Sequence, residues 1–150
     1  MVTVGRMDGL VELLGAVSMD PVPVGVPVAT ESVPAGFPSP AADYFDGDID
    51  LNDHLIRNRP ATFVVRVDGD SMTGAGIFDG DELVVDRSLD PVDGDVVIAL
   101  VDAELVVKTL RLAAAGPELH PANPAYPVLR PAGELMIWGV VTTCLHHLHR

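Results

Sequence analysis

From residue 61 onward, short apolar runs alternate with polar turns. Several runs are rich in Val, Ile, Leu and Phe, which favour strands, and they cover residues 62–67, 83–85, 96–101, 105–107 and 135–143. Asp-Gly pairs separate several of these runs, and residues 101–105 have the pattern of a tight hairpin turn. Short strands at such regular spacing predict a compact, largely antiparallel β domain.

The first 40 residues follow a different pattern. Six prolines fall between residues 21 and 40, and proline both fixes φ and lacks a backbone donor, so we expect this stretch to be extended. Before it, the apolar residues from Leu10 to Val17 are spaced loosely as on a short helix, although Gly9 and Gly15 weaken that assignment. Because this part is apolar, we expect an arm that docks onto another surface.

One short helix is expected between this arm and the strands. Asp50 is suited to cap it, and Leu51 and Leu55 share one of its faces. Pro60 ends it, so the sequence predicts a helix over residues 51–58.

The charge balance restricts the function. The chain has 150 residues, enough for one domain, and 48% of them are hydrophobic. It carries 22 acidic against 9 basic residues, a net charge of −13. Direct, sequence-specific DNA binding is therefore not expected, because neutralising phosphates requires clustered Lys and Arg. Any action near DNA is expected to go through another protein.

Neither a membrane span nor a secretion signal is expected. No apolar run approaches the roughly 18 residues of a membrane span. Residues 1–18 contain Asp8 and Glu12 and lack a basic start followed by an apolar stretch, so a secretory signal is not expected. Cys144 is the single cysteine, and we expect it to be a buried, inert thiol in a reducing compartment. We expect a cytoplasmic protein.

Two patterns resemble metal sites but do not match one. Asp-Gly-Asp occurs at residues 46–48, 68–70, 79–81 and 93–95. An EF-hand starting at Asp46 requires Gly and Glu where Leu51 and Arg57 stand, so acidic β-turns are expected. The cluster of His146, His147 and His149 is expected to be a surface tail. We expect neither a metal nor a cofactor.

Ser71 follows one of these triplets, at a transition from strand to turn. Taken alone, a serine there is more often a turn cap than a nucleophile. The histidines do not form a Ser-His-Asp set with it, so a nucleophilic Ser71 needs another base.

Lys108 is the candidate base. It lies in the apolar run 105–110 and is expected to point to the same side as Val106. A lysine there is costly unless it stays neutral, and a neutral amine is competent to take a proton from a serine hydroxyl. An edge-strand lysine with its charged end in water is the alternative that this strand alone leaves open.

Several motifs in order resemble those of UmuD proteins. Gly36-Phe37-Pro38-Ser39-Pro40-Ala41-Ala42-Asp43-Tyr44 resembles their cleavage-site region. Gly69-Asp70-Ser71-Met72 and Val107-Lys108 follow at similar spacing. Residues 123–126 and 138–141 look like the family's closing strands. The resemblance extends from Gly36 to Thr142.

UmuD proteins group with LexA and phage repressors, whose Ser/Lys dyad cuts their own chain. The resemblance implies that Ser71 is the nucleophile and Lys108 the general base, with the backbone N–H of Met72, and of Ser71 beside it, at the oxyanion. The bond cut is then Ala35–Gly36. It separates an N-terminal arm, residues 1–35, from a LexA/UmuD-like peptidase domain, residues 36–150.

The resemblance also implies a fold and partners. The fold is mainly β, like the LexA C-terminal domain, with a short helix and an extended N-terminal arm. The protein is expected to be a homodimer in the SOS response, stimulated to cleave itself by a RecA filament on single-stranded DNA. The shortened dimer then joins a UmuC-like Y-family polymerase as its regulatory subunit.

Three other functions are alternatives for this sequence. A LexA-like repressor needs a basic recognition helix, but residues 1–35 contain Arg6 as their only basic residue. A signal peptidase needs a membrane anchor. A non-cleaving β scaffold stays open, because the sequence does not show that Ser71 and Lys108 meet in space.

Overall fold

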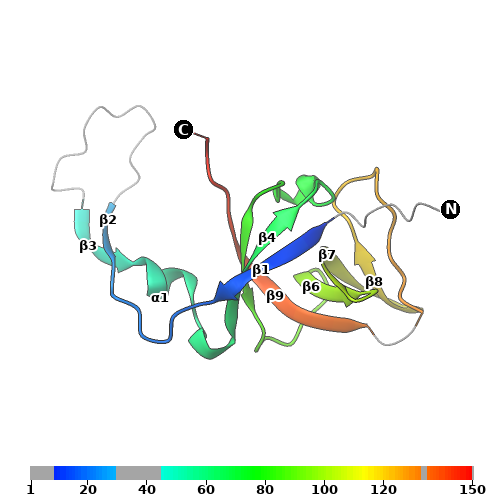
Figure 1. Cartoon of the computed structure of the whole chain (residues 1–150), viewed down its shortest axis with the longest axis horizontal. Coiled ribbons are helices and arrows are strands. Elements are labelled where there is room, and N and C mark those ends of the chain that lie inside the picture. Colours follow the sequence, from blue (N-terminus) through cyan, green and yellow to red (C-terminus); the bar gives the residue numbers. More distant parts are fainter. Residues whose placement is uncertain (1–8, 30–44, 133–134, 150) are drawn as a thin grey trace.

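Strands dominate the chain in the computed structural model, which describes residues 9–29, 45–132 and 135–149 (Figure 1). The elements are β1 (Leu10–Ala16), β2 (Gly25–Ala29), β3 (Phe45–Asp50), α1 (Leu51–Leu55), β4 (Thr62–Asp68), β5 (Glu82–Asp86), β6 (Val96–Val101), β7 (Glu104–Ala113), β8 (Gly116–His120) and β9 (Met136–Leu145), with single 3₁₀ turns η2 (Arg59–Ala61) and η3 (Thr73–Ala75). The expected mainly β fold with one short helix is confirmed. No helix among these residues has the length and apolarity to cross a membrane.

Seven of the strands form one antiparallel sheet in the order β1-β4-β5-β9-β6-β7-β8. Leu10 of β1 also pairs with Val106 of β7, and this second pairing closes the sheet into a barrel. β1 therefore fills the seam between β4 and β7. A closed sheet hides the edges of both strands.

The arm takes part in this sheet, which corrects the helix expected from Leu10 to Val17. β1 pairs with β4 from Leu10 opposite Asp68 to Ala16 opposite Phe63, with a register shift between Leu13 and Gly15. Pairing on both sides outweighs the weak helical spacing, because the two neighbouring strands offer partners for its backbone groups.

The core lies on both sides of β6 and β7. Val107 packs in one buried cluster with Val65, Leu83 and Ile98. Val106 packs in a second cluster with Leu110 and others, against which Leu10 of β1 also packs. Burying a Val or Leu side chain contributes about 1.5–3 kcal/mol, so these clusters fix β7 firmly.

Most of the turns form where the sequence predicts them. Asp102 and Ala103 have φ of 48° and 64°, which gives the tight β6–β7 hairpin predicted at residues 101–105. Gly80 has φ of 83°, and the carboxylate of Asp79 beside it accepts a hydrogen bond from Gly69 N–H. These Asp-Gly-Asp triplets are acidic turns, as expected. The triplet at residues 46–48 differs, since it lies within β3.

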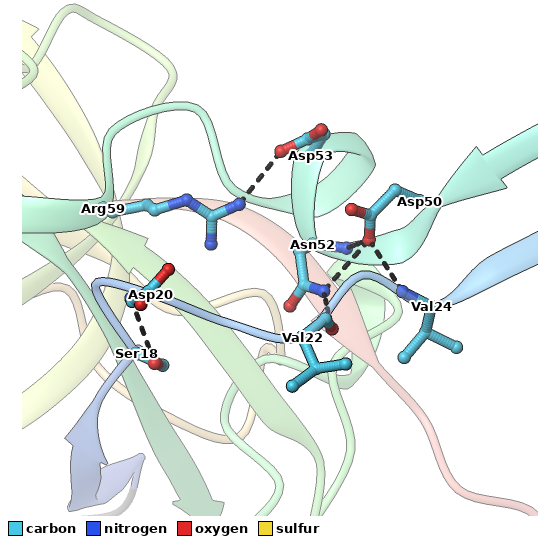
Figure 2. Close-up of polar contacts among 8 residues, drawn as sticks. All are labelled: Ser18, Asp20, Val22, Val24, Asp50, Asn52, Asp53 and Arg59. Carbon is cyan, nitrogen blue, oxygen red and sulfur yellow. Dashed lines mark hydrogen bonds and ion pairs between the residues drawn. The ribbon is translucent and has the colours of Figure 1, made fainter.

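The helix α1 is shorter than predicted and is tied to the arm (Figure 2). Asp50 caps it, with Oδ1 accepting from the backbone N–H of Asn52 at 3.0 Å and of Val24 at 3.4 Å. Asn52 Nδ2 donates to the same carboxylate oxygen and to the carbonyl of Val22, at 3.0 and 3.2 Å. These hydrogen bonds hold residues 22–24 of the arm against the start of the helix.

The strands β2 and β3 form a separate two-stranded antiparallel sheet. In Figure 1 this pair lies with α1 at one end of the molecule, apart from the barrel. Both strands flank residues 30–44 in the chain. The arm therefore contributes β1 to the barrel and β2 to this outlying pair.

Candidate active site

Ser71 stands just after β4, where the chain leaves the barrel wall. Gly69, with φ of 104°, allows the sharp turn that follows Asp68. Ser71 is 1% exposed, and the single turn η3 begins two residues later. The hydroxyl is thus held inside the protein by a turn between the end of a buried strand and a 3₁₀ turn.

Lys108 meets Ser71 from the other side of the seam. Its Nζ lies 2.9 Å from Ser71 Oγ, and the residue is 3% exposed. Val106 and Val107 are buried as well, so β7 is covered on both faces next to Lys108. The edge-strand alternative is wrong, because β7 lies between β6 and β8. Burial by itself disfavours the ammonium form of a lysine.

A loop outside the barrel clamps the turn that carries Ser71. Ala122 N–H donates to the carbonyl of Ser71 at 2.8 Å. Asn123 Nδ2 donates to the carbonyl of Asp70 at 2.9 Å, and the hydroxyl of Tyr126 donates to the Asp70 carboxylate. These bonds fix the backbone on both sides of the serine nitrogen.

This clamp corrects one expectation. Residues 123–126 are predicted to belong to a closing strand, but they form bends and a turn. The motif Asn-Pro-Ala-Tyr is visible in the sequence, but no sequence pattern indicates its contacts with Asp70. The feature of the motif that indicates a loop is its proline, which lies between the polar residues Asn123 and Tyr126.

The backbone beside Ser71 is suited to hold an anion. Met72 is 1% exposed, and its carbonyl accepts from the N–H groups of Ala75 and Ile77. Within the described part of the chain, neither Ser71 nor Met72 donates its own N–H to a protein acceptor. Two adjacent N–H groups in a dry site can therefore stabilise a negative charge that develops next to Ser71.

Gly9 lies against this pair of side chains, a contact that no sequence pattern indicates. Its carbonyl accepts from Val107 N–H at 2.8 Å. A Cβ on Gly9 would lie 2.5 Å from Lys108 Nζ and closer still to Ser71 Oγ. Its φ is 79°, so a residue with a side chain would also be strained there. The chain thus reaches the dyad with its backbone alone.

Comparison with known proteins agrees with this geometry. Residues 27–142 match the Peptidase S24-like family. The chain belongs to the S24-like peptidase family. The matched segment includes Ser71, Lys108 and the clamping loop.

Individual relatives show which known proteins this chain is similar to. Protein SamA of Salmonella typhimurium is 51% identical over 134 residues, which are 89% of this chain and 94% of SamA. Protein ImpA of Escherichia coli is 44% identical over 122 residues, 80% of this chain and 83% of ImpA. The LexA repressor of Alcanivorax borkumensis is 41% identical over 109 residues, 72% of this chain and 53% of that repressor. The resemblance to the UmuD-like proteins of SOS mutagenesis and to LexA is confirmed.

The expected cleavage bond of this S24-like peptidase, Ala35–Gly36, lies outside the described residues, as does the motif over residues 36–44. The structure does describe the strands on either side of it, β2 and β3, which pair with each other. Neither strand belongs to the seven-stranded sheet that carries the dyad.

Cys144 plays no part in the dyad, and its surroundings differ from the expectation. It is exposed rather than buried, and it lies near the end of β9. Its thiol donates to Asp81 Oδ2 at 3.3 Å. Partial desolvation, the hydrogen bond to Asp81 and the charge of that carboxylate raise the pKa of the thiol to about 11. A thiol so rarely ionised is a poor nucleophile.

Two residues of the histidine tail contact carboxylates at the start of β5. His146 Nδ1 lies 2.5 Å from Asp81 Oδ1, and His147 Nε2 lies 2.8 Å from Glu82 Oε1. Across residues 9–29, 45–132 and 135–149, no three His, Cys, Asp or Glu side chains gather as metal ligands. His146 and His147 therefore pair with carboxylates rather than with each other.

Proposed function

We propose that this protein is a self-cleaving serine peptidase of the SOS response, with Ser71 as nucleophile and Lys108 as general base. The observation that carries the proposal is the buried contact of 2.9 Å between Lys108 Nζ and Ser71 Oγ. Family membership supports the reaction class, since Peptidase S24-like is the matching family. The first 35 residues are the arm that cleavage removes, and residues 36–150 remain as the β domain.

The chemistry begins with a neutral Lys108. Its Nζ takes the proton of the Ser71 hydroxyl while Oγ attacks the carbonyl carbon of Ala35. The backbone N–H groups of Met72 and Ser71 hold the oxyanion of the tetrahedral intermediate. When it collapses, the bond from Ala35 to Gly36 breaks, and the Lys108 ammonium gives its proton to the amine of Gly36.

Water then completes the reaction. It attacks the ester between Ser71 and Ala35, and Lys108 again serves as base. The products are a fragment that ends at Ala35 and a chain that begins at Gly36. Small residues on both sides of the bond suit a narrow site, because Gly36 lets the backbone approach Ser71 closely.

The proposed cellular role follows the UmuD-like group. A RecA filament on single-stranded DNA stimulates cleavage, and the shortened protein acts as a homodimer in the cytoplasm. This dimer then joins a UmuC-like Y-family polymerase for translesion synthesis. The net charge of −13 fits a subunit that leaves DNA contact to its partners.

The test is the intact mass of the purified chain with and without RecA, ATP and single-stranded DNA. We expect a fragment beginning at Gly36, formed faster with the filament. It should be absent in Ser71→Ala and Lys108→Ala. It should be retained in the control Ser88→Ala, because Ser88 follows β5 and its hydroxyl donates to Asp86 rather than contacting Lys108. A folded protein that stays intact in every condition would rule out the peptidase function.

A further inference from the structure

The strand β1 lies between β4 and β7, and the residue before it, Gly9, lies against the dyad. We propose that residues 9–16 are a built-in competitor of the cleavage segment, which blocks the dyad until this strand leaves the seam. The inference rests on the proposed self-cleavage and adds its regulation. It assigns an inhibitory role to a part of the arm that lies well before the cleavage bond.

The seam is built to receive one extended strand. β4 and β7 do not pair with each other directly; each pairs with β1. Ser71 follows β4 and Lys108 lies on β7, so the dyad spans this same seam. An extended segment that enters it gains backbone hydrogen bonds from strands on both sides, as peptides do when they add to a sheet edge. In the structure, β1 uses those bonds.

The first bond of β1 in the seam lies directly beside the dyad. Val107 N–H, from the residue before Lys108, donates to the carbonyl of Gly9. The next residue, Leu10, pairs with Val106 and packs into the core. A second segment therefore cannot reach Ser71 along β7 while Gly9 and Leu10 stay in place.

Gly9 has the property that the cleavage bond also requires. It is buried against Ser71 Oγ and Lys108 Nζ, where no Cβ fits. The proposed cleavage segment likewise brings a glycine, Gly36, to the serine. Two glycine-containing segments of one arm thus fit the same narrow site, and only one of them fits at a time.

The strand is held loosely enough to be displaced. Leu13 and Leu14 are 48% and 40% exposed, and the pairing with β4 is interrupted at Gly15. The ion pair between Glu12 and Arg66 is long, at 3.9 Å, and exposed, so it contributes little. Only Leu10 and Val11 at the dyad end of β1 pack against the core clusters. Release of this short strand needs no unfolding of the rest of the barrel.

The arrangement of β2 and β3 agrees with this state. These strands flank residues 30–44, which contain Ala35 and Gly36, and they form their own sheet outside the barrel. In Figure 1 they lie at the opposite end of the molecule from β7 and β8. The conformation described is therefore one in which β1, and not the strands next to the cleavage bond, lies at the dyad.

A reversible cross-link tests the competition. Glu12 and Arg66 stand opposite each other on β1 and β4. The full-length variant Glu12→Cys/Arg66→Cys, with Cys144→Ser to avoid mispairing, locks β1 in the seam when oxidised and releases it when reduced. Val101→Cys/Glu104→Cys in the same background is the matched control, because it cross-links opposite residues of β6 and β7 and leaves β1 unlinked. Cleavage is followed by intact mass at alkaline pH.

We expect the oxidised Glu12→Cys/Arg66→Cys protein to form the Gly36 fragment at least about tenfold more slowly than its reduced form. The control should cleave equally fast in both forms. Equal rates in the oxidised and reduced test variant would overturn the inference and leave the proposed function intact. If the unmodified chain also stayed uncut, the proposed function itself would fail, and the inference with it.

A single substitution provides a second test. Gly9→Ala places a methyl group against the dyad, and it should drive β1 out of the seam and speed cleavage several-fold. Gly80→Ala is its matched control, since Gly80 has nearly the same φ, 83°, and open space around its Cβ position. An unchanged or slower rate in Gly9→Ala, with Gly80→Ala equal to wild type, would contradict the competitor role.

Discussion

Lys108 Nζ lies 2.9 Å from Ser71 Oγ, although the two residues are 37 positions apart in the chain. The contact exists because the turn after β4 and the middle of β7 meet across a single strand-wide seam. Neither strand alone identifies the pair as a dyad. A buried lysine on an apolar strand and a buried serine in a tight turn become interpretable only once they face each other.

Replacement of Lys108 by methionine separates catalysis from stability. The loss of a general base is expected to slow self-cleavage by about 10²–10⁴-fold. The free energy of unfolding should stay equal or rise, because an apolar side chain of similar length removes the penalty of burying an amine. Intact mass and urea denaturation measure the two effects. A Lys108→Met protein that still cleaves at the wild-type rate would contradict the role of Lys108.

Loss of a hydrogen bond that clamps the Ser71 turn should affect both stability and the rate of cleavage, unlike loss of Lys108. Asn123→Ala removes the hydrogen bond to the Asp70 carbonyl and should lower the free energy of unfolding by about 1 kcal/mol. Because the serine is then less well positioned, cleavage should slow by roughly 10- to 100-fold without a change in the pH at half-maximal rate. Asn58→Ala, which loses a hydrogen bond to Ser88 away from the dyad, is the control. A shifted pH midpoint in Asn123→Ala would indicate a role other than positioning.

Cys144 should react slowly for an exposed thiol. Its pKa is raised to about 11 by partial desolvation and by Asp81, so the thiolate is scarce at neutral pH. Alkylation by iodoacetamide should accelerate with pH up to about 11, and Asp81→Asn should shift this profile to lower pH. A wild-type midpoint at the ordinary value of a free cysteine would be inconsistent with the contact between Cys144 and Asp81.

The carboxyl group of Asp81 makes the free energy of unfolding depend on pH. Desolvation by itself would raise its pKa, but hydrogen bonds from Phe78 N–H, His146 and Cys144 and the charge of His146 outweigh this and lower the pKa below 3.8. A carboxyl group whose pKa is lowered on folding stabilises the folded state above its unfolded pKa, and this contribution is lost as the pH falls through the folded pKa. Urea denaturation of wild type and Asp81→Asn should therefore differ most at neutral pH, and the difference should shrink below about pH 4. A difference that stays constant down to pH 2 would contradict this.

Much of the barrel could be predicted because its strands are locally consistent. The run over residues 96–101 matches β6 at both ends, and the hairpin at residues 101–105 forms as expected. These features depend on neighbouring residues in the chain, which sequence patterns report directly.

The features that were missed depend on distant partners. β1 has helical spacing and two weakening glycines, and it is a strand because β4 and β7 offer it hydrogen bonds. β8 was not among the predicted strands, and it forms because its residues pair with β7 and continue the sheet. The position of Gly9 at the dyad is of the same kind, since only the closed barrel brings residue 9 next to residues 71 and 108.

The pH dependence of self-cleavage tests the central claim most directly. The purified chain is held between about pH 7 and about pH 10, and the fragment that begins at Gly36 is quantified by intact mass. The account predicts that its rate rises with pH, by up to about tenfold per unit, as Lys108 loses its proton, and that Ser71→Ala stays uncut throughout. A rate independent of pH, or a cut that persists in Ser71→Ala, would contradict a Ser71/Lys108 dyad.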